Sequence, residues 1–246
     1  MKFDETNTGG DERSFRQTST DLVQGLHSTD ERKYRDTFES FCRNYWKPVY
    51  AYLRAAWAKG NEEAKDLTQA FFLWLAEGDA LRRFEPERGS LRKYLRVLLR
   101  SFVGHHEVQL GRIKRGGAAT VVSLDASPLE LEDLAPGAGG SDPEAMYERT
   151  WRSSVVTNAL RELHRRSSAE GRLPAYRIFA EYNLTPEGVR PTYRDLAARY
   201  GVQEQDVKNS LLRMRDELRR EVRQELRRLA AHDGEVEDEW TLLFGE

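Results

Sequence analysis

The segment from Thr192 to Arg228 constrains the fold most, because it contains one glycine and no proline. A T-x-x-D pattern formed by Thr192 and Asp195 predicts a capped short helix, and Gly201 permits a sharp turn after it. A second helix then follows, since apolar residues recur at steps of four, three and four, at Val207, Leu211, Met214 and Leu218. The segment is therefore typical of a helix-turn-helix, whose second helix enters the major groove of DNA.

The second of these helices carries polar and basic side chains opposite its apolar stripe. With about 100° of rotation per residue, Lys208 and Arg215 lie on the flank, and the outward positions are Gln205, Asn209, Leu212, Arg213 and Asp216. Glutamine, asparagine and arginine can pair with base edges, at roughly 1–3 kcal/mol of discrimination each, and flanking cations contact phosphates. The alternative is an ordinary helical hairpin whose charged face is solvated.

Charge is segregated along the chain, although its formal net charge is only −2. Residues 82–115 hold ten Lys and Arg against three Asp and Glu, whereas residues 116–148 hold seven acidic residues and no Lys or Arg. Residues 208–228 are again basic, with eight against four, and residues 232–246 hold six acidic residues. Two basic blocks indicate a polyanionic partner contacted at two places, which the acidic spacer between them would avoid.

Helical periodicity extends over the rest of the chain, and the alternation typical of strands is not sustained. We expect an all-α protein of two helical domains joined by an acidic flexible linker. The expected parts are a mobile leader at 1–17, a first domain at 18–115, the linker at 116–145, a helix-turn-helix domain at 146–231 and an acidic tail at 232–246. Neither a signal peptide nor a transmembrane span is expected, and the single cysteine, Cys42, excludes an internal disulfide.

The helix expected from Ser90 to about Leu110 carries arginines at i, i+4 and i+8, which are Arg92, Arg96 and Arg100. Like charges at this spacing repel one another, so helix stability does not account for them, whereas a track for phosphates does. Lys93 lies beside this stripe, and Phe84 and Tyr94 are candidates for stacking on an unpaired base. A solvated charged face is the alternative interpretation.

The segment "DLTQAFFLWLAEG" carries more apolar residues than one core-facing stripe requires. Leu67, Phe71 and Trp74 form that stripe, and Phe72, Leu73 and Leu75 widen it. A helix with so broad an apolar arc is either buried on two sides or also docks a partner protein.

A metal or hydrolase site at "HHE", residues His105 to Glu107, is a further hypothesis. Adjacent histidines project from different faces of a helix, and the H-x-x-x-H spacing does not occur. We therefore expect no metal site there. We also expect the protein to use no cofactor and to have no enzymatic activity.

The order of these segments resembles one known family. "FCRNYWKPVYAYLRAAWAKGNEEAKDLTQAFFLWLAE" followed by "FEPERGSLRKYLRVLLRSFVGHHE" resembles the second conserved region of bacterial extracytoplasmic-function (ECF) sigma factors. "TYRDLAARYGVQEQDVKNSLLRMRDEL" resembles the helix-turn-helix of their fourth region, so the resemblance covers about Thr18 to Glu225. It implies a cytoplasmic, nucleoid-associated initiation factor that binds core RNA polymerase and promoter DNA, with an anti-sigma factor as an optional third partner.

Carried onto this sequence, the resemblance implies three sets of contact residues. The polymerase-binding set is Asp66, Gln69, Phe72 and Leu73. The set for the minus-ten element is Phe84, Arg92, Lys93, Tyr94, Arg96 and Arg100. The set for the minus-thirty-five element is Gln205, Lys208, Asn209, Arg213 and Arg215. The acidic linker is expected to thread toward the polymerase active-site cleft.

Two further expectations concern the tail and the overall function. The acidic tail is expected to fold back on the basic helix and restrain it, because the two segments are opposite in charge. The alternative function is a stand-alone helix-turn-helix regulator that binds DNA without polymerase.

Overall fold

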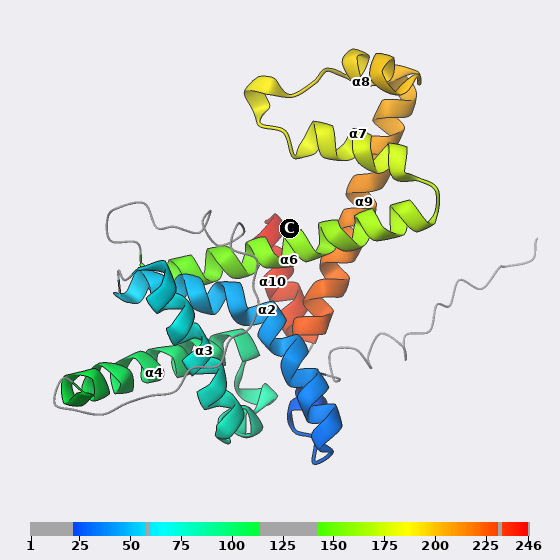
Figure 1. Ribbon diagram of the computed structural model, residues 1–246. Coiled ribbons are helices and arrows are strands. Elements are labelled where there is room, and N and C mark those ends of the chain that lie inside the picture. Colours follow the sequence, from blue (N-terminus) through cyan, green and yellow to red (C-terminus); the bar gives the residue numbers. More distant parts are fainter. Residues whose placement is uncertain (1–21, 58–59, 114–141, 231–232, 246) are drawn as a thin grey trace, which may run out of the picture. The chain divides into compact units, whose positions relative to one another are not determined.

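The computed structural model describes residues 22–57, 60–113, 142–230 and 233–245 (Figure 1). Within these ranges the chain forms helices and no strand, so the all-α fold is confirmed. The chain divides into two compact units, the first formed by Met1–Arg152 with Arg227–Glu246 and the second by Ser153–Leu226. These borders differ from the expected ones, because the tail belongs to the first unit. The expected leader and most of the linker lie outside the described residues.

The first unit is built mainly from three long helices. Its elements are α2 (Glu31–Trp57), α3 (Asn61–Glu77), η1 (Leu81–Arg83), η2 (Pro86–Arg88), α4 (Leu91–Ile113), the start of α6 (Pro143–Ala169) and α10 (Asp233–Phe244). Asp30 caps α2, because its Oδ1 accepts the backbone N–H groups of Arg32 and Lys33 at 2.9 and 3.3 Å. The helix continues through Pro48.

Aromatic rings connect α3 to the helices on both sides of it. Phe72 stacks on Trp46 of α2, with ring centroids 5.6 Å apart and an interplanar angle of 12°. Phe71 meets Phe102 of α4 edge to face at 5.3 Å. The broad apolar arc of α3 is therefore largely explained by burial on two sides, which was one of the two interpretations of its sequence.

The second unit contains two helices joined by a three-residue turn. Its elements are the rest of α6, α7 (Leu173–Asn183), η3 (Glu187–Val189), α8 (Tyr193–Tyr200) and most of α9 (Glu204–Leu229). Thr192 and Asp195 form the expected capping box on α8. Gly201 ends α8 in the left-handed conformation, at φ 64° and ψ 36°, which residues with a side chain rarely adopt. The carboxylate of Asp206 then accepts the backbone N–H of Gln203 at 3.1 Å, just before α9 begins.

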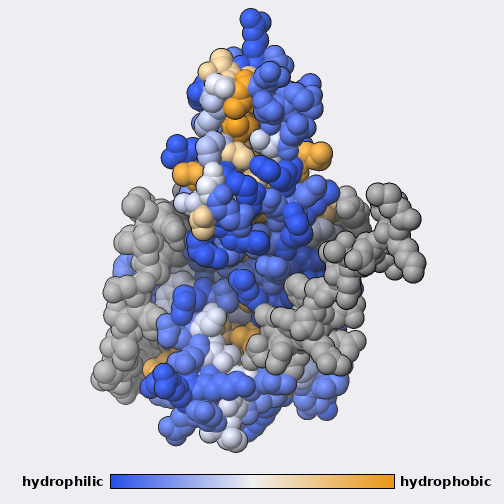
Figure 2. Space-filling model, turned by 90° about the vertical axis from the view of Figure 1, so that its right-hand side faces the viewer, coloured by the Kyte–Doolittle hydropathy of each residue, from blue (hydrophilic) through white to orange (hydrophobic). Residues whose placement is uncertain are grey.

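One core holds these helices together. It consists of Leu163, Ile178, Phe179, Leu196, Ala197, Val207, Leu211 and Met214. The apolar stripe predicted for α9 is thus confirmed, with Leu218 partly buried at its end. Burial of each such leucine or isoleucine stabilises the unit by about 1.5–3 kcal/mol, which fixes which face of α9 points away from the core. On the face shown in Figure 2 the surface is mostly hydrophilic, with a short hydrophobic strip in the upper part of the picture and smaller hydrophobic spots below it.

Candidate nucleic-acid and protein interfaces

The outward face of α9 presents all five residues predicted to contact DNA at the minus-thirty-five element. Gln205, Lys208, Asn209, Arg213 and Arg215 are all exposed. Gln205 donates from Nε2 to Oδ1 of Asn209 at 3.2 Å, so the two amides lie one turn apart on the same face. Leu212 lies among them and is 62% exposed. The arrangement offers a row of amide and guanidinium donors with one apolar contact, as base edges and thymine methyl groups require.

The acidic residues in the second half of α9 face inward. Arg172 donates from Nη1 to both carboxylate oxygens of Glu217, at 2.7 and 2.9 Å. Glu221 pairs with Arg166, and Oε1 of Glu225 accepts from Nδ2 of Asn158 at 2.8 Å. Glu221 and Glu225 are both buried. Because these carboxylates are used within the unit, the exposed face of α9 is more basic than its composition indicates.

A pocket of about 270 Å³ opens where η1, η2 and the start of α4 meet. Arg83, Arg88 and Lys93 bring three exposed cations to its wall, and Phe84 and Tyr94 bring their rings. Glu85 also lines the pocket and pairs with Arg88 at 2.7 Å, and Arg83 lies 3.9 Å from the carboxylate of Asp79, so two of the three cations have an acidic neighbour. Tyr94 donates its hydroxyl to the carbonyl oxygen of Ala80 at 2.8 Å, which ties the two walls together. Burial raises the pKa of Tyr94, so this hydroxyl stays protonated at neutral pH.

Phe84 occupies a different position from the one expected for a base-stacking residue. Its side chain is only 3% exposed, and its ring packs against Tyr94 with centroids 5.4 Å apart. The buried ring of Phe84 therefore packs against Tyr94 and holds it in position. Tyr94 and Lys93 are the residues that a ligand in the pocket could reach. Arg83 and Arg88 were missed by the sequence prediction, because they lie in the loop before the arginine stripe.

The arginine stripe of α4 is not an open track. Arg92 is 3% exposed and is contacted by the carboxylates of Glu148 and Glu239. Its guanidinium also lies over the ring of Trp151, at 4.6 Å from the centroid. The expectation that Arg92 is presented to phosphates is wrong for this structure, because α6 and α10 cover it.

The other two arginines of the stripe pair with the same acidic helix. Arg96 contacts Glu148 from Nη1 at 3.2 Å and Glu144 from Nε at 3.6 Å. Arg100 is exposed but pairs with Glu144. Glu144 and Glu148, at the end of the acidic block, therefore pair with the three arginines of the stripe. The acidic tail contributes Glu239, which meets Arg92 of α4, whereas restraint of the basic helix by the tail stays a prediction.

The residues predicted to bind polymerase divide between the core and the surface of α3. Phe72 is 5% exposed and belongs to the core, so it is not part of the surface. Asp66 is exposed and Gln69 is half-buried. Leu73 is 46% exposed, and Trp74, which the prediction assigned to the core, is 39% exposed. Leu73 and Trp74 follow each other in the sequence, so α3 exposes two large apolar side chains about two turns after Asp66.

The described ranges lack both a metal-binding cluster and a membrane-spanning helix. They hold no group of three or more His, Cys, Asp or Glu side chains that could bind a metal ion. The side chains of His105 to Glu107 lie outside the described residues. In the same ranges, every helix is too short or too polar to cross a membrane.

Comparisons with known proteins give no relative for this chain. It matches no protein-family model, no curated protein and no solved structure.

Proposed function

We propose that this chain is a sigma factor, which binds core bacterial RNA polymerase and directs promoter-specific initiation without a chemical step of its own. The observation that carries the proposal is the exposed row of Gln205, Asn209 and Arg213 on α9, behind a capped short helix and a glycine turn. In the helix-turn-helix proteins that bind DNA, the second helix places side chains of these types against base edges.

The first unit supplies the further surfaces that such a factor requires. In the proposed function, Tyr94, Lys93, Arg83 and Arg88 line a pocket for an unstacked base and its phosphates at the minus-ten element. An aromatic ring flanked by cations is the usual way in which proteins bind single strands. Leu73 and Trp74, about two turns after Asp66, form the contact with polymerase. The proposal places the protein in the cytoplasm, at the nucleoid.

A stand-alone helix-turn-helix regulator is the second candidate function. It is favoured by the same face of α9, and also by the ion pairs of Arg92, Arg96 and Arg100, which remove one reason for expecting a second DNA-binding surface. The two functions differ in whether polymerase is a partner.

Co-purification with core RNA polymerase separates the two candidates. The sigma function predicts that the tagged chain retains core enzyme and that Leu73→Asp weakens this by at least about tenfold, because a charge then enters an apolar contact. Leu242→Asp on α10 is the matched control, since Leu242 is 54% exposed and lies in the same unit. DNA binding by the chain without any retention of core enzyme would instead support the regulator.

A further inference from the structure

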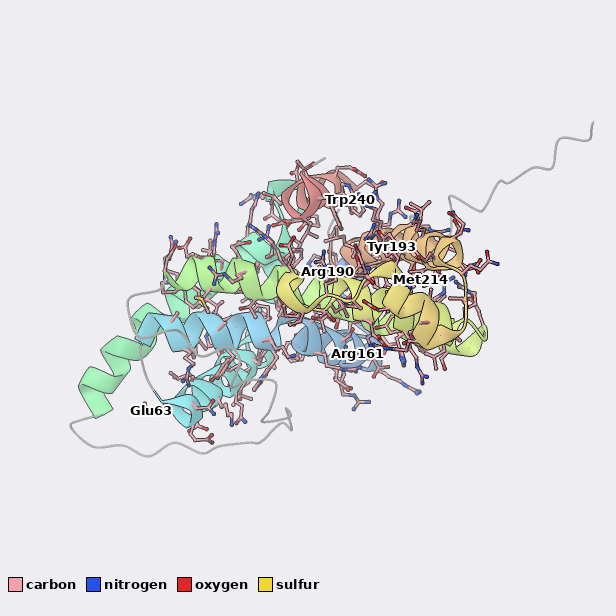
Figure 3. The ribbon with its side chains drawn as sticks, turned by 90° about the horizontal axis from the view of Figure 1, so that it is seen from above. Glu63, Arg161, Arg190, Tyr193, Met214 and Trp240 are labelled. Carbon is pink, nitrogen blue, oxygen red and sulfur yellow. The ribbon has the colours of Figure 1, made fainter. Side chains whose placement is uncertain are left out.

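The second unit carries a cluster of two tyrosines and three cations at the side of α9. The rings of Tyr182 on α7 and Tyr193 on α8 lie 5.1 Å apart, centroid to centroid. Arg190, in the segment between η3 and α8, lies over Tyr182 at 5.2 Å, and Arg215 of α9 lies over the same ring at 5.9 Å. Lys208 of α9 lies over Tyr193 at 5.8 Å. Arg190 and Tyr193 are labelled in Figure 3.

Within the described part of the chain, these three cations lack carboxylate partners, whereas four arginines of the same unit have one. Arg165, Arg166, Arg172 and Arg199 each pair with a glutamate. Among the described residues, no Asp or Glu lies within ion-pair distance of Arg190, Lys208 or Arg215. Three unbalanced cations around one pair of rings repel one another, and exposed cation–π contacts return only about 0.5–1 kcal/mol each.

The cluster is nevertheless held in place. Tyr182 and Tyr193 are partly buried against the core of the unit, which fixes their rings. Arg215 donates from Nε to Oδ1 of Asn183 at 3.1 Å, so its remaining N–H groups are oriented by this bond. The pKa of Tyr193 is raised, chiefly by its hydrogen bond with Tyr182, so its hydroxyl stays protonated at neutral pH.

We propose that Arg190, Lys208 and Arg215, supported by Tyr182 and Tyr193, bind the phosphate backbone of duplex DNA. The partner is identified by chemistry, because guanidinium, ammonium and phenol groups are donors that phosphate oxygens accept. Duplex DNA is the polyanion favoured, since Lys208 and Arg215 border the face of α9 that carries Gln205, Asn209 and Arg213. The η3–α8 segment thereby extends the contact beyond α9.

This inference rests on the proposed DNA-binding role of α9 and adds Arg190 to it. Backbone contacts position a protein without reading sequence, so loss of Arg190 weakens binding to every duplex by a similar factor. Each phosphate contact also contributes about 0.9 to the slope of log affinity against log salt. Between about 50 and 200 mM salt, a variant lacking one contact therefore loses about 3.5-fold less affinity than the natural chain.

The test measures fluorescence anisotropy of two labelled duplexes of unrelated sequence with the full chain, over a series of NaCl concentrations. Arg190→Ala is expected to weaken both complexes by the same factor and to lower the salt slope by about 0.9, and Arg190→Lys to restore most of both. Arg161→Ala is the charge-matched control, because Arg161 is exposed on α6 and contacts Asn158 without a carboxylate. It is expected to leave the slope unchanged.

The outcomes separate this inference from the proposal on which it rests. If the natural chain binds duplex DNA but Arg190→Ala has the affinity and slope of Arg161→Ala, the phosphate contact is refuted and DNA binding by α9 stands. If the natural chain binds neither duplex at the lowest salt, both are refuted. A loss on one duplex alone would also overturn the inference, because it would mean that Arg190 reads bases.

Discussion

Removal of Glu239 tests whether the arginine stripe of α4 belongs to the core of the first unit. The side chains of Arg92 and Glu239 are 3% and 4% exposed, so the charge of Arg92 is balanced inside the protein. Breaking a buried ion pair from one side costs about 3–5 kcal/mol, because the remaining charge is left uncompensated. Glu148 still contacts Arg92 in Glu239→Gln, so we expect a loss near the lower limit, about 3 kcal/mol.

Urea denaturation, followed by tryptophan fluorescence, measures this loss of stability specifically in the first unit. All five tryptophans lie within the residues of the first unit, so their emission reports its unfolding and not that of the second unit. Trp151 is itself in contact with Arg92. Arg92→Met is expected to cost at least as much as Glu239→Gln, because it leaves the buried Glu239 without its partner and leaves Glu148 with Arg96 alone.

A double-mutant cycle distinguishes the pair from two independent effects. The double variant Arg92→Met with Glu239→Leu is expected to lose less free energy of unfolding than the summed losses of Arg92→Met alone and Glu239→Leu alone. The difference is expected to be at least about 1.5 kcal/mol. Lys93→Met is the control, since Lys93 is exposed on the same helix, and it is expected to stay within about 0.5 kcal/mol of the natural chain. Changes at Arg92 and Glu239 as small as those at Lys93 would refute the buried pair and restore an open arginine track.

Three further predictions follow from the two units. Lys93→Glu is expected to weaken binding of a single-stranded oligonucleotide about tenfold, as measured by fluorescence anisotropy. The control, Arg35→Glu on the exposed face of α2, is expected to leave this binding unchanged. Equal losses of affinity in the two variants would exclude the pocket as the binding site. Burial raises the pKa of Cys42 to about 12. Alkylation of Cys42 by iodoacetamide at pH 8 is therefore expected to be about 10³-fold slower in the folded protein than in the protein unfolded in urea. Equal rates in the two states would contradict the burial of Cys42. Thr192→Ala is expected to cost the second unit about 1 kcal/mol at pH 7, measured by urea denaturation with circular dichroism. Because the Thr192 hydroxyl lowers the pKa of Asp195, this cost shrinks as the pH falls through that pKa; a cost independent of pH would count against the capping box.

Local periodicity was sufficient to predict the helices and the inner face of α9. Val207, Leu211 and Met214 are all buried, as their spacing requires, and the cap at Thr192 and the turn at Gly201 are where the sequence places them. These features depend on residues within one or two helical turns of each other, so the sequence contains the information needed.

The arginine stripe was misread because its partners are distant in sequence. Arg100, Arg96 and Arg92 pair with glutamates 44, 52 and 147 residues away, respectively. The spacing on α4 shows only that like charges are close, and it does not reveal the acidic residues that fold over them. The charge blocks did contain a signal, because the net charges of residues 82–115 and 116–148 are equal and opposite.

The surface of α3 could be predicted only in part for a similar reason. The width of its apolar arc did not show which members are used by α2 and α4. Phe72 stacks on Trp46 in the core, whereas Trp74 extends to the surface although it has the spacing of a core residue. Which side chain of a broad arc remains exposed depends on the positions of both neighbouring helices.

Run-off transcription with purified core RNA polymerase and a library of promoter fragments tests the central claim most directly. The account predicts specific transcripts that require both the core enzyme and this chain, from templates sharing two sequence elements. It also predicts that Leu73→Asp and the triple change of Gln205, Asn209 and Arg213 to Ala each abolish them. Absence of any chain-dependent transcript, with a folded chain and an active core enzyme, would contradict the proposed function.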